Sequence, residues 1–192
     1  MRIESLEQSD AVLVEAAQQG RLESYGALYQ RYHNPIVALA YAQLGDKHSA
    51  EDAAQEVFAI ACRDLRSLRD RDKFGAWLGG ICRNVAKQML RVKTRTAPLP
   101  GRDADGDAGY CVSADEPEQE EQWDIVRKAV WKLPEAEREL VVMRYFNGFS
   151  QARISQVLDM TPAAVNGRLT RAKRRIAQLL ERDGFGSESW DA

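Results

Sequence analysis

The segment from residue 96 to residue 122 constrains the fold more than any other feature of the sequence. It places prolines and glycines among aspartates and glutamates and contains few large apolar side chains. Such a composition cannot bury enough apolar surface to fold alone. We therefore expect it to be a flexible acidic linker, about 90 Å long when fully extended. A linker at this place divides the chain. We expect a domain at 10–95, the linker at 96–122, a domain at 123–182 and a tail at 183–192.

Both flanking parts have the apolar spacing of helices. Apolar side chains recur every three or four positions, as on one face of a helix. A stripe of this kind consists of Phe74, Trp77, Leu78, Ile81, Val85 and Val92. No alternating run bounded by a tight turn indicates a hairpin. The sequence therefore predicts an all-α fold of two small helical domains.

Polar residues and prolines predict where several helices begin and end. His33-Asn34-Pro35 is expected to interrupt the first long helical stretch, because proline disrupts helix interiors. Ser49, three residues before Asp52, has the spacing of a capping box. Ser150 is expected to cap a short helix. Thr161 followed by Pro162 predicts an N-cap with proline at the first helical position.

The net charge of −2 conceals three blocks of opposite sign. Residues 63–95 contain 10 Lys and Arg against 3 Asp and Glu, and residues 162–182 contain 6 against 1. Residues 103–124 contain 9 Asp and Glu and no Lys or Arg. Two basic blocks separated by an acidic block predict two nucleic-acid contacts in one chain.

The second basic block has the pattern of a helix-turn-helix. A short helix ends at Asp159-Met160, and the helix that follows carries polar and basic residues from its start. The N-terminal half of such a helix reads bases in the major groove. Candidate base contacts are Ala163, Asn166, Gly167, Arg168, Thr170 and Arg171. Candidate phosphate contacts are Lys173, Arg174 and Arg175. The alternative is a solvated basic face on an ordinary helical hairpin.

The helix from Phe74 combines the apolar stripe with a basic face that also carries Asn84. Cations and nearby aromatic rings suit single-stranded nucleic acid. Alternatively, Phe74 and Trp77 belong to the core, since they share a stripe with Ile81.

The preceding helix carries a patch of polar residues. The default interpretation of such a patch is a solvated face. It consists of Asp52, Gln55 and Glu56.

The remaining patterns argue against an enzyme, a metal site and a membrane span. No carboxylate pair, Ser/His/Asp set or phosphate-binding glycine loop appears at useful spacing, so no cofactor or small-molecule substrate is expected. No apolar run reaches 18 residues and no signal peptide is visible, so we expect a cytoplasmic protein without membrane insertion. The cysteines are expected to be reduced and to fill packing space, and the histidines do not stand at zinc-ligand spacing from them. These residues are Cys62, Cys82, Cys111, His33 and His48.

Two sets of motifs in this order resemble the sigma-70 family of transcription initiation factors. Residues 49–58, SAEDAAQEVF, and residues 74–84, FGAWLGGICRN, are similar to sigma region 2. Leu133-Pro134, residues 144–150 (RYFNGFS) and residues 165–173 (VNGRLTRAK) are similar to region 4. The resemblance covers roughly residues 10–95 and 123–182, without an intervening domain. This arrangement resembles the extracytoplasmic-function group.

The resemblance implies an alternative sigma factor, with core RNA polymerase, promoter DNA and an anti-sigma factor as partners. It reverses the default interpretation of the polar patch and assigns polymerase docking to Asp52, Gln55 and Glu56. It assigns the −10 element to Asn84, which would read a flipped-out base, together with Lys73, Arg83, Lys87 and Arg91. It assigns the −35 duplex to Ala163, Asn166, Arg168, Thr170, Arg171, Lys173, Arg174 and Arg175.

The chain departs from the family pattern in the helix-turn-helix. The departures are Arg153 for Glu, Ser155 for Ala, Asp159 for Gly, Ala164 for Thr and Gly167 for Ser. They predict a −35 preference of its own or weaker phosphate contacts. The main rival function is a helix-turn-helix regulator that binds an operator as a dimer without polymerase. No dimerisation coiled coil is visible in the sequence, which disfavours this rival.

Overall fold

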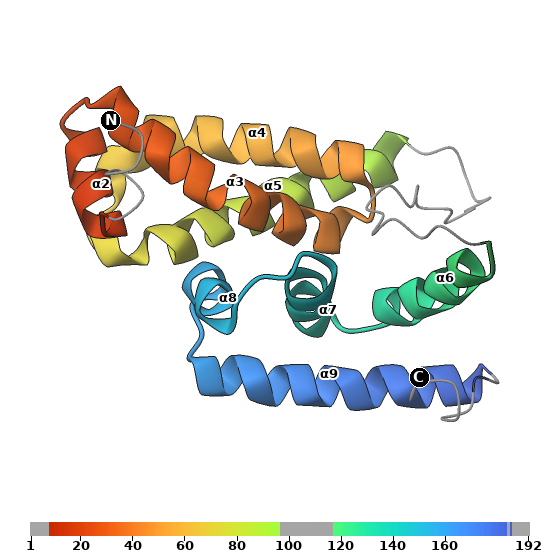
Figure 1. The fold of residues 1–192 in the computed structure, drawn as a ribbon. Helices are drawn as coiled ribbons and strands as arrows, with labels where there is room; N and C mark the ends of the chain where they lie inside the picture. Colours follow the sequence, from red (N-terminus) through yellow and green to blue (C-terminus); the bar gives the residue numbers. More distant parts are fainter. Residues whose placement is uncertain (1–7, 97–116, 184, 186–192) are drawn as a thin grey trace.

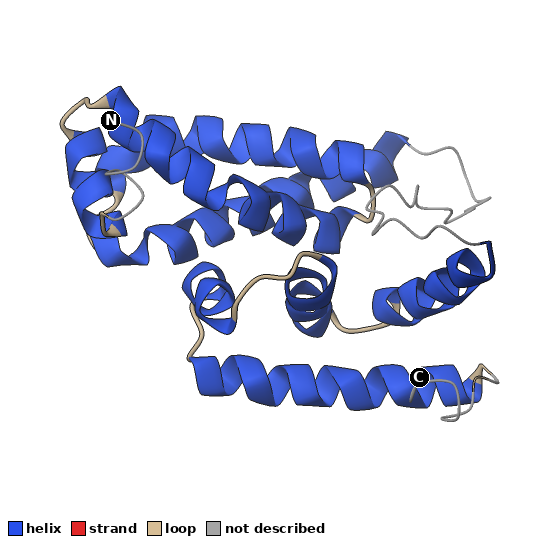
Figure 2. Cartoon of the chain, in the orientation of Figure 1, coloured by secondary structure: helices blue, strands red, loops and turns tan. Residues whose placement is uncertain are grey.

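The computed structural model describes residues 8–96, 117–183 and 185, and the described part consists of helices and short connections (Figure 2). This confirms the all-α fold class. The first domain contains α2 (Asp10–Gln18), α3 (Leu22–Leu44), α4 (Lys47–Asp64) and α5 (Phe74–Thr96). The connection between α4 and α5 contains the 3₁₀ turns η1 (Leu65–Ser67) and η2 (Arg71–Lys73). Among the described residues, no helix is both long and apolar enough to cross a membrane.

Helix α3 runs without interruption through Pro35, so the predicted break at this residue is wrong. Proline in a helix interior costs about 3 kcal/mol. Tyr32 and Ile36 on either side of it are fully buried, and α3 packs against α2, α4 and α5. The continuous apolar face explains why the helix persists, since it can be buried only if the helix extends past the proline.

The predicted cap at the start of α4 is also wrong by three residues. Asp46 is the N-cap, and its side chain accepts a hydrogen bond from the backbone N–H of Ser49 at 2.8 Å. The Ser49 hydroxyl instead accepts a hydrogen bond from Lys93 Nζ at 2.9 Å. Lys93 also forms an ion pair with Asp46 at 2.9 Å, and this pair ties the end of α5 to the start of α4.

Helix α5 buries a narrower stripe than the sequence predicted. Phe74, Leu78 and Val85 are buried, whereas Val92 is 60% exposed. Lys93, the next residue, faces Asp46 on α4. Successive residues are rotated by about 100° around a helix, so Val92 is directed away from the contact that Lys93 makes.

The second domain contains α6 (Pro117–Trp131), α7 (Glu135–Val141), the π-helical turn η3 (Val142–Phe146), α8 (Gln151–Leu158) and α9 (Pro162–Arg182). Helix α6 begins inside the range expected to be linker, and residues 97–116 of that range lie outside the described residues. The predicted caps are confirmed, since Ser150 accepts from Arg153 N–H and Thr161 accepts from Ala164 N–H.

The two domains pack against each other, which the sequence did not predict. Helix α8 packs on α5, α7 packs on α3, and α9 covers the other side of α7 and α8 (Figure 1). One continuous apolar core includes Leu39 and Leu78 of the first domain with Leu140 and Ile154 of the second. The sides of α3 and α5 toward the second domain are therefore covered.

Candidate nucleic-acid interface

Helix α9 has the geometry of a recognition helix. Val165, Leu169 and Ala172 are buried against the rest of the second domain. Pro162 occupies the first turn, and Thr161 caps the helix. The solvent-facing side carries most of the predicted −35 residues, namely Ala163, Asn166, Thr170, Arg171, Lys173, Arg174 and Arg175. Arg168, also predicted, is half-buried. The structure therefore brings the predicted set onto one helix, with its base-reading candidates near the N-terminus.

Some of the α9 side chains have contacts within the second domain. Lys173 Nζ lies 5.1 Å from the centre of the Tyr145 ring, a cation–π contact. Arg175 forms an ion pair with Glu137 at 3.1 Å. These contacts fix the middle of α9 against α7 and η3. Gly167 leaves open space where a side chain would stand, so a base edge could approach the backbone there.

The helix-turn-helix connection ends α8 with a left-handed residue. Asp159 has a φ of 53°, and its backbone N–H donates to the carbonyl of Ser155. Asp and Asn adopt this conformation more easily than other non-glycine residues. Asp159 can therefore stand where the family pattern has glycine.

On α5, the structure separates the predicted −10 residues into two groups. Asn84, Lys87 and Arg91 are exposed on the side of the helix opposite the core. Phe74 is fully buried and packs edge-on against Tyr32, so the core interpretation of this ring is correct. Trp77 is half-buried, and the centre of its ring lies 6.0 Å from the centre of the Phe74 ring. The exposed face can bind phosphates and a base, and the aromatic spine beneath it holds the helix in place.

The other two predicted −10 residues have carboxylate partners in the second domain. Arg83 donates through Nε and Nη2 to the two carboxylate oxygens of Glu139, at 3.1 and 3.0 Å. Lys73 Nζ lies 2.5 Å from Asp159 Oδ1. Burial disfavours the charge of Arg83, but the hydrogen bonds and the charge of Glu139 raise its pKa above the ordinary value. Hydrogen bonding to Asp159 raises the pKa of Lys73.

Glu139 is a polar residue that sequence reasoning missed. Its side chain is only 4% exposed, and it also accepts a hydrogen bond from Gln43 at 3.0 Å. A buried carboxylate requires several donors to offset its lost hydration. Its three donor groups come from α3 and α5, in the other domain. Helical periodicity would have placed an isolated glutamate on the surface.

The polar patch on α4 is exposed as predicted. Asp52, Gln55 and Glu56 face solvent, while Ala54, Val57 and Phe58 are buried beneath them. Tyr29 of α3 lies beside this helix. The centre of its ring is 4.6 Å from the centre of the Phe58 ring, the two rings are tilted relative to each other, and Tyr29 is 37% exposed. Tyrosine is enriched among the residues that contribute most to protein–protein binding.

The cysteines differ in their surroundings. Cys82 is buried, as expected, and burial together with the nearby Glu139 raises the pKa of its thiol to about 12. Cys62 is exposed, so the predicted packing role is wrong for this residue. Cys111 lies outside the described residues. In the described part of the chain, no group of three His, Cys, Asp or Glu side chains could hold a metal ion.

Comparison with known families supports the two-domain interpretation. Residues 28–96 match the family description "Sigma-70 region 2", and residues 123–176 match "Sigma-70, region 4". The first match contains the α4 patch and the basic face of α5. The second match contains the helix-turn-helix, except for the end of α9.

Several curated relatives are similar along most of the chain. The RNA polymerase sigma-H factor of Pseudomonas aeruginosa is 30% identical, over 91% of this chain and 95% of that protein. The sigma-E factor of Escherichia coli, of the extracytoplasmic-function group, is 31% identical over 88% of this chain and 92% of that protein. The relative BldN of Streptomyces coelicolor is 31% identical, and the match spans 66% of its length.

Solved structures show the same fold at lower identity. CnrH, in complex with the cytosolic domain of CnrY, has a TM-score of 0.60 at 24% identity, covering 92% of this chain and 99% of that one. RpoE of Bartonella quintana, in complex with the anti-sigma factor NepR, has a TM-score of 0.53 at 20% identity, covering 83% and 98%. With both family regions matched in order and with relatives similar over nearly their whole length, the chain belongs to the extracytoplasmic-function group of the sigma-70 family.

Proposed function

We propose that this chain is an alternative sigma factor that docks on core RNA polymerase through α4 and contacts two promoter elements through α5 and α9. One observation carries the proposal: α5 and α9, one in each matched region, both present a basic outer face over a buried apolar stripe. Sigma factors are DNA-binding regulators rather than enzymes, and the chemistry proposed here requires only binding. Because RNA polymerase and the chromosome are cytoplasmic in bacteria, the chain would act there.

The −10 element would be held as single-stranded DNA by α5. The Asn84 side chain offers both a donor and an acceptor to the edge of an unstacked base. Lys87 and Arg91, one and two turns further along, suit the phosphates that flank it. Unstacking a base costs a few kcal/mol. Contacts made only with the flipped base would offset that cost and favour melted DNA over duplex.

The −35 element would be read as duplex by α9. Asn166 suits adenine, while Arg168 and Arg171 suit guanine in the major groove. Lys173, Arg174 and Arg175 would bind phosphates and set the register. The small side chains at the start of the helix, Ala163 and Gly167, would allow close approach to the bases.

The α4 patch would bind a basic surface of the polymerase, with Asp52 and Glu56 as charged contacts and Tyr29 as an aromatic neighbour. An anti-sigma factor is the second protein partner that we propose. The structure of RpoE with NepR supports it, because that related fold binds such a protein. Which surface of this chain it would cover is a separate question from polymerase docking.

The test is transcription in vitro with core RNA polymerase, this protein and fragments of genomic DNA, followed by mapping of start sites. We expect transcripts that depend on the protein and begin downstream of a shared pair of elements. Glu56→Lys should reduce core binding about tenfold or more, since like charges oppose across the contact. Glu23→Lys, the same charge change at an exposed site on α3, is the control.

Two results would contradict the proposal. Core polymerase that shows no affinity for the protein would remove the docking role. Tight binding of one duplex operator without polymerase, by a dimer, would favour the rival helix-turn-helix regulator.

A further inference from the structure

A cavity of about 300 Å³ lies in the first domain, where α2, the start of α3, the end of α4 and η1 meet. Three arginines line it: Arg21 at the N-cap of α3, Arg63 in the last turn of α4 and Arg66 in η1. Among the described residues that line the cavity, none is an aspartate or a glutamate. The cavity is therefore cationic, and it shares no lining residue with the α4 patch, the exposed face of α5 or the outer face of α9.

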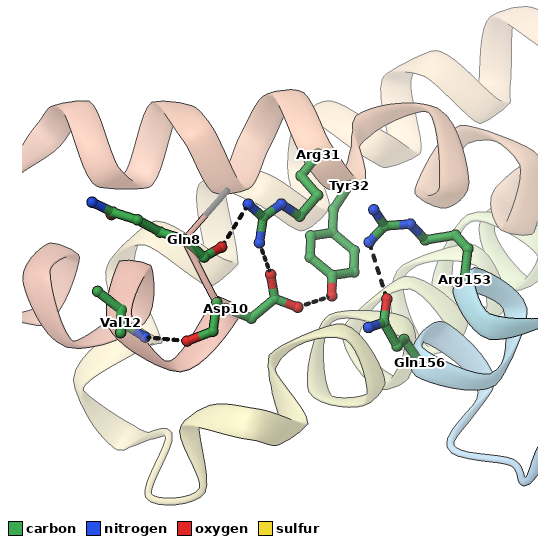
Figure 3. A network of polar contacts seen from close by, with 8 residues as sticks. Gln8, Asp10, Val12, Arg31, Tyr32, Arg153 and Gln156 are labelled. Atoms are coloured by element: carbon green, nitrogen blue, oxygen red, sulfur yellow. Dashed lines mark hydrogen bonds and ion pairs between the residues drawn. The ribbon is translucent and has the colours of Figure 1, made fainter. Parts of the chain in front are cut away.

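Other arginines of the first domain have carboxylate partners on neighbouring elements. Arg31 of α3 pairs with Asp10 of α2 (Figure 3). Arg71 of η2 pairs with Glu15 of α2 at 3.1 Å. These pairs join one element to the next, which accounts for both cations as parts of the fold.

The three arginines of the cavity have no carboxylate partner on another element in the described part of the chain. Arg63 pairs with the adjacent Asp64 at 2.8 Å, and 71% of the Arg63 side chain is exposed. Arg21 reaches the side-chain oxygen of Gln19 at 3.4 Å, and the Arg66 side chain has no hydrogen bond or ion pair with any described residue. Because exposed ion pairs contribute little to stability, all three guanidinium groups are available to a ligand.

The uncharged walls of the cavity are held by internal hydrogen bonds. Gln18 donates to the carbonyl oxygen of Leu65 at 3.0 Å and accepts from Arg71 Nε at 3.1 Å. Tyr25 donates its hydroxyl to the carbonyl oxygen of Phe58 at 2.5 Å. Burial raises the pKa of Tyr25, so its phenol is neutral and does not repel an anion. The walls are thus preorganised around the arginines.

The charge and size of the cavity select the chemistry of a ligand. Guanidinium groups bind the paired oxygens of a phosphate in a fork geometry. A phosphate monoester carries about two negative charges near neutral pH, whereas each phosphodiester of a DNA strand carries one. Three cations without an acid therefore favour the monoester. A volume of about 300 Å³ is at the small end of the range for small-molecule sites.

We propose that this cavity binds a small phosphate monoester with an apolar or aromatic body, such as a nucleoside monophosphate, held by Arg21, Arg63 and Arg66. Leu22, which is 79% exposed, and Leu65 offer apolar surface to that body. The proposal does not rest on the proposed function, since none of the three arginines is assigned to polymerase or to DNA. A bound phosphate would join α3, α4 and η1, so its concentration would determine how stable the first domain is.

Cys62 lines the same cavity and is exposed, so its thiol can report occupancy. In a full-length Cys111→Ser variant, in which Cys82 is buried, the alkylation of Cys62 by uncharged iodoacetamide is followed as adenosine 5′-monophosphate is added. The concentration that gives half-maximal protection measures affinity. We expect protection by the monophosphate and none by adenosine, which lacks the phosphate. Cyclic adenosine monophosphate, a diester with one charge, should protect about tenfold more weakly, the effect of losing one hydrogen bond to a charged group.

Arg66→Gln and Arg69→Gln form a matched pair of variants. Both residues are exposed arginines of the connection between α4 and α5, but only Arg66 lines the cavity. Arg66→Gln should raise the half-protecting concentration of the monophosphate about tenfold, and Arg69→Gln should leave it unchanged. Arg21→Gln, on another element, should have the same effect as Arg66→Gln. The half-protecting concentration is compared rather than the rate, because removing a nearby cation also changes the reactivity of the thiol.

The melting temperature of the full chain is a second readout that does not use the thiol. A ligand that binds only the folded chain raises its melting temperature. The monophosphate should therefore stabilise the wild type and Arg69→Gln, and should stabilise Arg66→Gln less at the same concentration.

Absence of protection by the monophosphate would overturn the inference, as would equal half-protecting concentrations in Arg66→Gln and Arg69→Gln. Protection by an unphosphorylated oligothymidine but not by the monophosphate would assign the cavity to a DNA strand and would overturn it as well. Failure of the chain to bind core polymerase would contradict the proposed function and leave this inference intact, since neither measurement uses polymerase.

Discussion

Replacing Glu139 by glutamine should weaken the contact between the two domains and increase the affinity of the chain for single-stranded DNA, because Arg83 loses its charged partner. The Glu139 side chain is 4% exposed and accepts two hydrogen bonds from Arg83 and one from Gln43. Glutamine keeps the shape and one acceptor oxygen but loses the charge. Hydrogen bonds to charged groups contribute about 1.5–3 kcal/mol. Losing one such contribution would shift the equilibrium between packed and separated domains by roughly 10- to 150-fold, at 1.4 kcal/mol per factor of ten.

Arg83→Ala separates this explanation from a general loss of stability. It breaks the same contact from the other side, so it should weaken the packing of the two domains to a similar extent. It also removes a cation that would bind DNA, so oligothymidine affinity should fall below that of Glu139→Gln. Glu137→Gln, which breaks the pair with Arg175 inside the second domain, serves as the control.

The assay combines fluorescence transfer between dyes on the exposed positions Cys62 and Ala177→Cys, in a Cys111→Ser background, with titration of a fluorescent oligothymidine. Circular dichroism and urea unfolding of each variant would show that the domains remain folded. Equal DNA affinities in Glu139→Gln and Arg83→Ala, or unchanged fluorescence transfer in both, would refute the expectation that Glu139 keeps Arg83 from binding DNA.

Two further predictions concern the first domain. Asp46→Ala should lower stability by about 1–2 kcal/mol, mostly through the lost N-cap. Burial opposes its charge, but hydrogen bonds from Lys93 and Ser49 lower the pKa of Asp46 from 3.8 to about 2. Its stabilisation is therefore present above about pH 4 and is lost as the pH falls toward 2, so melting curves of wild type and variant should converge there; a constant gap would contradict this. Asn84→Ala should reduce open-complex formation more than closed-complex binding, with Gln88→Ala as the control on the same helix; footprinting that shows the reverse would remove the base-reading role.

Local patterns predicted much of the fold because their physical causes are local. The caps at Ser150 and Thr161 follow from side chains that bond N–H groups three residues away. The outward direction of Asp52 and Asn84 follows from helical periodicity alone. Where tertiary packing competes with a local signal, the local signal failed. Pro35 lies inside a helix because both neighbouring turns are buried.

Contacts between distant parts of the sequence could not be predicted in this way. Arg83 and Glu139 are 56 residues apart, and the acidic linker lies between them. Nothing in the pattern around Glu139 marks it as buried, since its neighbours Glu135 and Glu137 also carry charge. A buried carboxylate is recognised only when its donors are known, and here the donors belong to the other domain.

The departures from the family pattern take on a different meaning in the structure. From the sequence, Arg153 and Asp159 suggested an altered −35 preference, because they lie in the helix-turn-helix. Yet Arg153 stacks on Tyr32 and Asp159 pairs with Lys73, so both side chains face the first domain. The base-reading positions of α9 lie on the opposite side, in solvent. If these two residues tuned −35 recognition, their replacement would change sequence preference in closed promoter complexes. If they hold the two domains together, their replacement would weaken the interdomain contact and leave that preference intact.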